Sequence, residues 1–252
     1  PESLCVSFCD RHYGVGADGI ILMERSQVAD AKMRMFNSDG SEGKMAGNAL
    51  RCMAKYLYDN GIVRKEEMTL ETDKGTKTVR VYTTDGRVTS ACVDMGYATL
   101  DTTALRLNIP KRQVVNYPVE IAGQPWEITC VDMGNPHCVV FCSRVDGVDV
   151  ARIGPQFEHA PYFPDRINTE FIRVVNPSTI KMRVWERGSG ETLACGSGAC
   201  AAVVAAVANN LCSKGSDVTV KVRGGDLVVN YTDERVTLTG DAKLVYTGVV
   251  EY

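Results

Sequence analysis

Residues 186–208 read ERGSGETLACGSGACAAVVAAVA, a charged, glycine-rich loop that leads to Cys195 and then to an uncharged apolar run. A helix that is apolar on every face belongs in a protein core. We therefore predict a buried helix that begins just after Cys195. The free N–H groups and the positive dipole end of such a helix favour a thiolate over a thiol and suit the binding of a carboxylate. The alternative is that Cys195 is a small, inert core residue.

The pattern of strand, loop and helix occurs a second time, earlier in the chain. A shift of 149 residues lays 33–60 over 182–209 and brings Gly47-Asn48 onto Gly196-Ser197. A repeat of this length indicates two copies of one domain rather than a solenoid. The sequence thus predicts an α+β fold of two pseudo-symmetric half-domains, each a strand-rich, barrel-like sheet around a central helix. Half-domains that face each other would bring both helix starts to one cleft.

The repeat also sets the expected domain boundaries. We expect an N-terminal half-domain of residues 1–100 together with about 241–252, and a C-terminal half-domain of residues 101–240. The polar stretch 97–117 is the expected crossover between them. The stretch 133–141 opens the second copy with a turn and a strand, and its counterpart would precede Pro1. We therefore expect the first strand of the first half to be missing from this sequence.

Local patterns place the remaining elements of the first half. The helix after Gly47 is amphipathic, and Asn60-Gly61 should end it. Asp85-Gly86 is typical of a hairpin turn. Strand patterns cover residues 20–23, 33–36, 68–72, 76–82 and 87–95.

Composition narrows the function classes. The 252 residues include 28 basic and 31 acidic ones, so the net charge of −3 argues against nucleic-acid and membrane-surface partners. No apolar run reaches the roughly 18 residues of a membrane-spanning helix. The ten cysteines are scattered without zinc spacing and the chain has three histidines, so we expect no metal site. This cysteine usage indicates reduced thiols in a cytoplasmic protein.

Five motifs together are specific enough to indicate a family. They are residues 11–19, 37–42, 133–137, 166–170 and 186–200, which read RHYGVGADG, NSDGSE, MGNPH, RINTE and ERGSGETLACGSGAC. In these motifs the chain resembles the diaminopimelate epimerases, which are amino-acid epimerases that use no pyridoxal phosphate. The resemblance implies an isomerase of lysine and peptidoglycan precursor biosynthesis that interconverts L,L- and meso-diaminopimelate without a cofactor. It implies a small amino-acid substrate and admits a homodimer.

The resemblance also implies one catalytic cysteine from each half, one acting as thiolate base and the other as thiol acid on the opposite face of the substrate. Cys195 is one of the two. The other should precede Gly47-Asn48, where this sequence has Ala46. Cys52 does not replace it, because it lies about a turn and a half into the helix. Ala46 is either an engineered replacement or a natural alteration, and the intact remainder of the motifs favours engineering.

The family's other site residues carry over by position. His137 and Glu186 would help to set the protonation of the cysteines. Asn135 could also be a turn former, and His137 a paired core histidine. The expected substrate ligands are Asn37, Asn135 and Asn168 for the distal amino-acid end, Gly47, Asn48, Gly196 and Ser197 for the reacting α-carboxylate, and Glu186 and Arg187 for further polar groups.

Removal of an α-hydrogen without a cofactor requires a site that stabilises carbanion character with preorganised dipoles. Two helix starts aimed at one carboxylate would supply them. One alternative function is that of a racemase for another amino acid on the same fold, such as proline or histidine. Another is a non-catalytic amino-acid-binding protein in which Ala46 is natural. The three asparagines and Arg187 favour a substrate with a second zwitterionic end.

Overall fold

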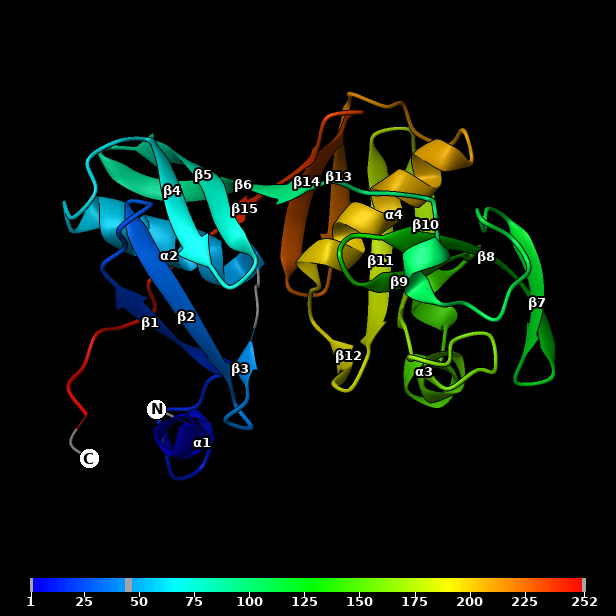
Figure 1. The fold of residues 1–252 in the computed structure, drawn as a ribbon, viewed down its shortest axis with the longest axis horizontal. Helices are drawn as coiled ribbons and strands as arrows, with labels where there is room; N and C mark the ends of the chain where they lie inside the picture. The colour runs from blue at the N-terminus through cyan, green and yellow to red at the C-terminus, as the bar shows by residue number, and fades with distance from the viewer. Residues whose placement is uncertain (1, 44–46, 251–252) are drawn as a thin grey trace. The chain divides into compact units, whose positions relative to one another are not determined.

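The computed structural model describes residues 2–43 and 47–250, and the chain divides into two compact units. Unit 1 comprises Pro1–Asp94 and Thr239–Tyr252, and unit 2 comprises Met95–Leu238. The chain passes from unit 1 to unit 2 within β6 (Arg87–Gly96) and returns within β15 (Val236–Asp241). Both units are strand-rich mixtures of α and β structure (Figure 1). In the described parts of the chain, no helix combines the length and apolar character needed to cross a membrane.

Unit 1 has one five-stranded path in the order β1-β2-β4-β5-β6, with β3 paired to β2. The β2–β4 pair is parallel, and the pairs β1–β2, β4–β5 and β5–β6 are antiparallel. Its elements before β6 are α1 (Glu2–Cys9), β1 (Gly19–Glu24), β2 (Ala31–Asn37), β3 (Glu42–Gly43), α2 (Gly47–Asp59), β4 (Glu67–Thr72) and β5 (Gly75–Thr84).

The turns of unit 1 confirm two predictions. After α2, Gly61 takes the left-handed conformation with φ of 68°, and the N–H of Ile62 donates to the carbonyl of Leu57 at 2.9 Å. This is the backbone reversal with which glycine ends helices. Between β5 and β6, Asp85 and Gly86 have φ of 51° and 76°. Positive φ at both central residues is the conformation of a two-residue hairpin turn.

Unit 2 has a seven-stranded path in the order β14-β13-β11-β10-β9-β8-β7, with β12 paired to β11. The β9–β10 and β11–β13 pairs are parallel, and the other pairs along this path are antiparallel. Its helices and strands are η1 (Thr103–Leu105), β7 (Tyr117–Ile121), β8 (Gln124–Asp132), β9 (Pro136–Phe141), η2 (Val145–Gly147), α3 (Val150–Glu158), β10 (Asn168–Asn176), β11 (Thr179–Glu186), β12 (Gly190–Thr192), α4 (Gly196–Ala208), β13 (Asp217–Val222) and β14 (Gly225–Tyr231).

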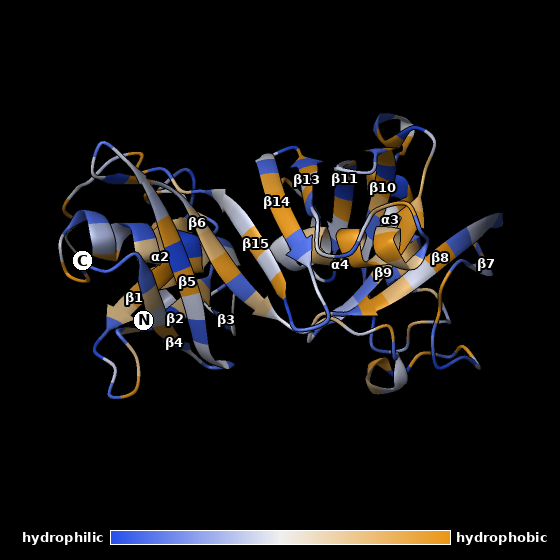
Figure 2. Cartoon of the chain, turned by 90° about the horizontal axis from the view of Figure 1, so that it is seen from above, coloured by the Kyte–Doolittle hydropathy of each residue, from blue (hydrophilic) through white to orange (hydrophobic). Residues whose placement is uncertain are grey.

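The helix α4 is the centre of unit 2. It packs against β8, β9, β10, β11, β13 and β14, and its residues 199–206 have no exposed surface. Figure 2 shows it as hydrophobic along its length. The predicted buried helix after Cys195 is therefore confirmed. Its position among six strands fixes its first turn, because a helix enclosed in this way cannot slide or tilt without opening the core.

The repeat seen in the sequence is present in the element bounds. The helices α2 and α4 are both 13 residues long, and their first residues, Gly47 and Gly196, are 149 positions apart. Each follows a strand, a turn and a short paired strand, which are β2 and β3 in unit 1 and β11 and β12 in unit 2. Each precedes an antiparallel hairpin, β4–β5 or β13–β14.

Two helices accompany the predicted central ones, α1 in unit 1 and α3 in unit 2. The sequence gives little sign of α3, which has only nine residues and contains Pro155. Asp149 starts it by accepting a hydrogen bond from the N–H of Arg152. Gly154 lets it approach β11, because a Cβ at that position would lie 2.4 Å from the Trp185 ring. The expected crossover 97–117 belongs wholly to unit 2, where Ile109 and Val114 are core residues.

Candidate active site

Cys195 lies at the start of α4, as predicted. Its backbone is extended, with φ of −129° and ψ of 115°, and its sulfur accepts a hydrogen bond from the N–H of Gly198 at 3.4 Å. The sulfur also lies 3.6 Å from the hydroxyl of Ser197. The residue is 8% exposed. A nucleophilic side chain therefore caps the central helix of unit 2, and an N–H of the first helical turn donates to it.

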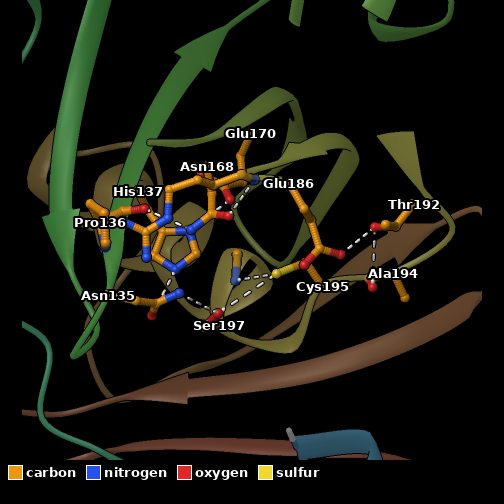
Figure 3. A network of polar contacts seen from close by, with 12 residues as sticks. Asn135, Pro136, His137, Asn168, Glu170, Glu186, Thr192, Ala194, Cys195 and Ser197 are labelled. Carbon is orange, nitrogen blue, oxygen red and sulfur yellow. Dashed lines mark hydrogen bonds and ion pairs between the residues drawn. The ribbon is translucent and has the colours of Figure 1, made fainter. Parts of the chain in front are cut away.

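Glu186 approaches the same thiol from the end of β11. The β11–β12 hairpin pairs Glu186 with Gly190 and returns the chain so that the Thr192 hydroxyl donates to the Glu186 carboxylate. The Glu186 carboxyl group also hydrogen-bonds with Cys195. Figure 3 shows these three side chains together beside Ser197. The glycines of the 186–192 stretch thus serve a tight turn that delivers a carboxyl group to the cysteine.

A second line of contacts reaches Ser197 from β9. The amide nitrogen of Asn135 lies 3.5 Å from the Ser197 hydroxyl, and its amide oxygen lies 3.1 Å from Nε2 of His137. Nδ1 of His137 lies 2.7 Å from the carboxylate of Glu170 on β10 (Figure 3). His137 and Glu170 have no exposed surface. Asn135 is therefore more than a turn residue, and His137 is both a paired core histidine and part of the network that leads to Cys195.

Asn168 and Arg187 hold the backbone around this network. Asn168 donates to the carbonyl of Pro136 at 2.8 Å and accepts from the N–H of Arg187 at 2.9 Å. The Arg187 side chain is exposed and donates to the carbonyl of Asp165 at 3.1 Å. Asn168 thereby ties the start of β9 to the turn after β11, and this link keeps His137 and Glu186 at fixed positions in the unit.

The electrostatics correct one expectation about Cys195. Burial raises the pKa of this thiol well above its usual range, and the charges of Glu186 and Glu170 raise it further. The hydrogen bonds from Ser197 and from the N–H of Gly198 lower the pKa of Cys195, but they do not reverse its direction. The prediction that the helix start favours the thiolate is therefore wrong for this chain in the absence of a ligand. Loss of water and two nearby carboxyl groups outweigh one helix dipole.

Glu186 experiences the same surroundings. Burial raises the pKa of its carboxyl group, whereas the hydrogen bonds from Thr192 and Cys195 lower it. Repulsion by Glu170 raises the pKa of Glu186 and the nearby His137 lowers it. Both pKa values are raised, so in the resting site Glu186 and Cys195 both favour their protonated forms more than the free side chains do.

Unit 1 contains the other predicted ligands. Asn37 ends β2, and its amide donates to the hydroxyl of Ser41 at 3.0 Å. Gly47 and Asn48 begin α2, where Asn48 is exposed and accepts a hydrogen bond from Arg51 at 2.6 Å. Ala46, the position expected to hold the first catalytic cysteine, lies outside the described residues. Each helix start thus has polar side chains from its own unit.

Three residues of these two half-sites were not predicted as site residues. Thr192 positions Glu186, Glu170 holds His137, and Arg51 holds Asn48. A signal for Glu170 is present in the sequence, since it is a charged residue next to Phe171-Ile172 in an apolar strand. The spacing of Asn48 and Arg51 also brings them together on one helix face.

Comparison with known proteins gives one consistent family. A family model described as diaminopimelate epimerase matches residues 2–100 and 129–245. A diaminopimelate epimerase from Desulfovibrio desulfuricans is 46% identical over 256 residues, which cover 98% of this chain and 88% of that protein. Those from Acetivibrio thermocellus and Geobacillus kaustophilus are 46% and 48% identical and cover 100% and 98% of this chain, and 90% and 86% of their own lengths.

Solved structures with the same fold are more distant in sequence. A probable proline racemase from Agrobacterium radiobacter is similar with a TM-score of 0.68 and 16% identity over 95% of this chain and 78% of its own. A hydroxyproline epimerase from Agrobacterium vitis has a TM-score of 0.69 and 14% identity over 96% of this chain and 78% of its own. At these identities the likeness concerns the fold.

Proposed function

The chain belongs to the diaminopimelate epimerase family, isomerases of lysine biosynthesis, and we propose that its reaction is the cofactor-free interconversion of L,L- and meso-diaminopimelate by two cysteines. The observation that carries this proposal is the position of Cys195 at the start of α4, hydrogen-bonded to Glu186 and linked through Ser197 and Asn135 to His137. In the proposal, units 1 and 2 are the two half-domains, and α2 and α4 are their matching helices.

In the proposed reaction the N–H groups at the start of α4 bind the reacting α-carboxylate. A thiolate on one face takes the α-hydrogen as a proton, and its electron pair remains on the α-carbon and the carboxylate. The thiol of Cys195 then gives its proton to the opposite face and becomes the thiolate. Preorganised helix N–H groups stabilise the negative charge that develops between the two transfers. The raised pKa of Cys195 supports its role as the protonated partner in the resting site.

Asn135, Asn168 and Arg187 are proposed to serve the distal amino-acid end. Of the three, Arg187 has an exposed guanidinium that could bind a carboxylate with two hydrogen bonds. Asn168 acts mainly through the backbone that it ties together. Asn37, from unit 1, would supply the remaining amide.

The base in this scheme is a cysteine at position 46, where the sequence has alanine. We expect the chain as it stands to bind diaminopimelate, because alanine leaves the backbone N–H groups of the helix start intact. It should not interconvert the epimers, since one face of the α-carbon has no thiol. Cys195 alone could exchange the α-hydrogen on its own side with solvent and return the same epimer.

The test compares the chain with its Ala46→Cys variant in heavy water, following both epimer composition and deuterium incorporation. We expect the variant to interconvert the epimers under reducing conditions, and the chain with Ala46 to lack this activity. Oxidation should inactivate the variant as the two facing thiols form a disulfide. A further Cys195→Ala change in the variant should abolish epimerisation again.

Two results would contradict the proposal. Full turnover by the chain with Ala46 would show that the reaction does not need a thiol at position 46. An inactive Ala46→Cys variant that still binds diaminopimelate would favour the amino-acid-binding alternative.

A further inference from the structure

Glu170 is a fully buried carboxyl group that the two-cysteine reaction does not itself use. It lies on β10 between β9 and β11, paired in register with Val139 and Val184. One oxygen, Oε1, reaches Nδ1 of His137, and among the described residues the other, Oε2, has no hydrogen-bond partner. Burial of a carboxylate with an unsatisfied oxygen costs stability. Groups that carry such a cost in a native protein commonly serve a functional site.

The carboxyl group lies against the first turn of α4. A Cβ at Gly198 would lie 2.6 Å from Oε1 of Glu170 and 3.2 Å from its carboxyl carbon. The absence of a side chain at Gly198 is what makes room for it. The same residue donates its N–H to the sulfur of Cys195. Glu170 and Cys195 therefore contact the same residue of the helix start from two sides.

The contact with His137 defines where protons lie. With the Asn135 amide as oriented, its oxygen can only accept, so Nε2 of His137 carries a hydrogen and donates to it. The 2.7 Å contact between Nδ1 and Glu170 then needs one further proton. Where Glu170 is the carboxylate, that proton lies on Nδ1, and the carboxylate fixes the orientation of the ring. Through Asn135, that ring orientation determines which atom faces Ser197 beside the thiol.

Two titratable groups from neighbouring strands act on the charge of Cys195, namely Glu186 from β11 and Glu170 from β10. His137 from β9 acts on Glu186 and contacts Glu170. Thr192 from β12 and Ser197 from α4 contribute hydroxyl groups. Both groups that act directly on the sulfur are acidic, so the surroundings oppose a negative charge on it.

We propose that Glu170 is a positioning residue, whose buried carboxyl group fixes His137 and, by placing negative charge under the start of α4, keeps Cys195 in its thiol form. The proposal rests on the proposed function for the use of that thiol as an acid. The arrangement itself requires neither diaminopimelate nor a second cysteine. A carboxylate beneath a helix start disfavours a second anion at that start, so it disfavours the thiolate of Cys195. A residue that is to act as an acid must hold its proton before the reaction begins.

The test measures alkylation of Cys195 by iodoacetamide as a function of pH, followed peptide by peptide with mass spectrometry in the chain with Ala46. Glu170→Gln keeps the shape of the side chain and removes its charge, so the pH midpoint for Cys195 should fall. If the midpoint falls by one pH unit, the thiolate fraction at any pH below the midpoint rises about tenfold. A thiolate of lower pKa is also a weaker nucleophile, so the alkylation rate should rise by about threefold in all.

Glu127→Gln is the control. Glu127 lies on β8 of the same unit and is exposed. Its replacement removes the same charge from the protein and should leave the Cys195 midpoint unchanged. An unchanged midpoint in Glu170→Gln, or an equal shift in Glu127→Gln, would overturn the proposal. A failed epimerase assay would not affect it, since the labelling needs no turnover.

Discussion

At Cys195 a helix start and two carboxyl groups act in opposite directions on one thiol. The N–H of Gly198 and the hydroxyl of Ser197 stabilise a thiolate, whereas burial, Glu186 and Glu170 destabilise it. The second set prevails because a helix start contributes about 0.3–2 kcal/mol, while full burial of a charged group costs more. A substrate α-carboxylate bound at the same N–H groups would also destabilise the thiolate, because it adds a further negative charge. The thiol form is thus the state that a bound anion reinforces.

Gly198 gives a stability prediction at the residue scale. Alanine in a helix is favoured over glycine by about 1 kcal/mol. At this position, however, the new Cβ would lie 2.6 Å from Glu170, and overpacking of this kind costs about 1–3 kcal/mol. We expect Gly198→Ala to lower the free energy of unfolding, measured by urea denaturation.

Gly196→Ala provides the control for Gly198→Ala. Its Cβ would meet the end of the flexible Leu238 side chain at 3.1 Å. That side chain can move by a few tenths of an ångström, so we expect a smaller change in the free energy of unfolding. A Gly198→Ala protein as stable as Gly196→Ala would show that the Glu170 carboxyl group is free to move.

At the scale of elements, one carboxylate connects α3 with the turn between β11 and β12. Glu158, 4% exposed, accepts hydrogen bonds from Trp185 Nε1 at 2.7 Å and from the N–H of Gly188 at 2.9 Å. Arg166 adds an ion pair at 3.2 Å. This turn carries Glu186 and Arg187, so a helix that the sequence barely signals supports the substrate side of the half-site.

Glu158→Gln should therefore destabilise the protein in a pH-dependent way. Burial alone would raise the pKa of Glu158, but the bonds from Trp185 and Gly188 and the nearby cations bring it below its usual value. A lowered pKa contributes stability above the unfolded value of about 4.3 and loses it as pH falls further. We expect a loss of about 1–3 kcal/mol at pH 7 that shrinks towards pH 3, measured by thermal unfolding. The exposed Glu127→Gln is the control, and an equal loss at both pH values would contradict the assignment.

The elements that could be predicted from sequence are those with strong local signals. The start of α4 at Cys195, the end of α2 at Gly61 and the turn at Asp85-Gly86 depend on nearby residues, and all three are confirmed. The contact between His137 and Glu170 depends on the parallel pairing of β9 with β10, which local patterns do not specify. The direction of the Cys195 pKa depends on burial and on the charges of Glu186 and Glu170, which come from two different strands. It was therefore beyond a prediction based on the helix dipole alone.

Across the whole molecule, the two copies of the repeat share the same order of strands and helix but differ in the charged residues near the helix start. At the shift of 149 residues that matches α2 with α4, Glu170 corresponds to Ile21 and Glu186 to Asn37. Cys200, buried in α4, corresponds to Arg51 in α2. Arg51 is 5% exposed, and its guanidinium lies 2.6 Å from the side-chain oxygen of Asn48 near the start of the helix. One helix start thus has acidic neighbours and the other has a buried cation.

This difference predicts that the two thiols of the Ala46→Cys variant titrate apart. The positions of unit 1 that correspond to Glu170 and Glu186 hold the uncharged Ile21 and Asn37, and Arg51 lies one turn into α2, so the introduced thiol should ionise at the lower pH. Iodoacetamide labelling across pH, read by mass spectrometry, should give a midpoint for it at least about one unit below that of Cys195. Cys52, an exposed thiol on the same helix, provides a reference within each sample. A cofactor-free epimerase needs one thiolate and one thiol at the same moment. If the two cysteine positions differ in their electrostatic surroundings, one thiol ionises before the other, and no separate proton-transfer step is needed to form the pair. Equal midpoints, or a higher midpoint for the introduced thiol, would mean that the substrate rather than the protein decides which cysteine holds the proton.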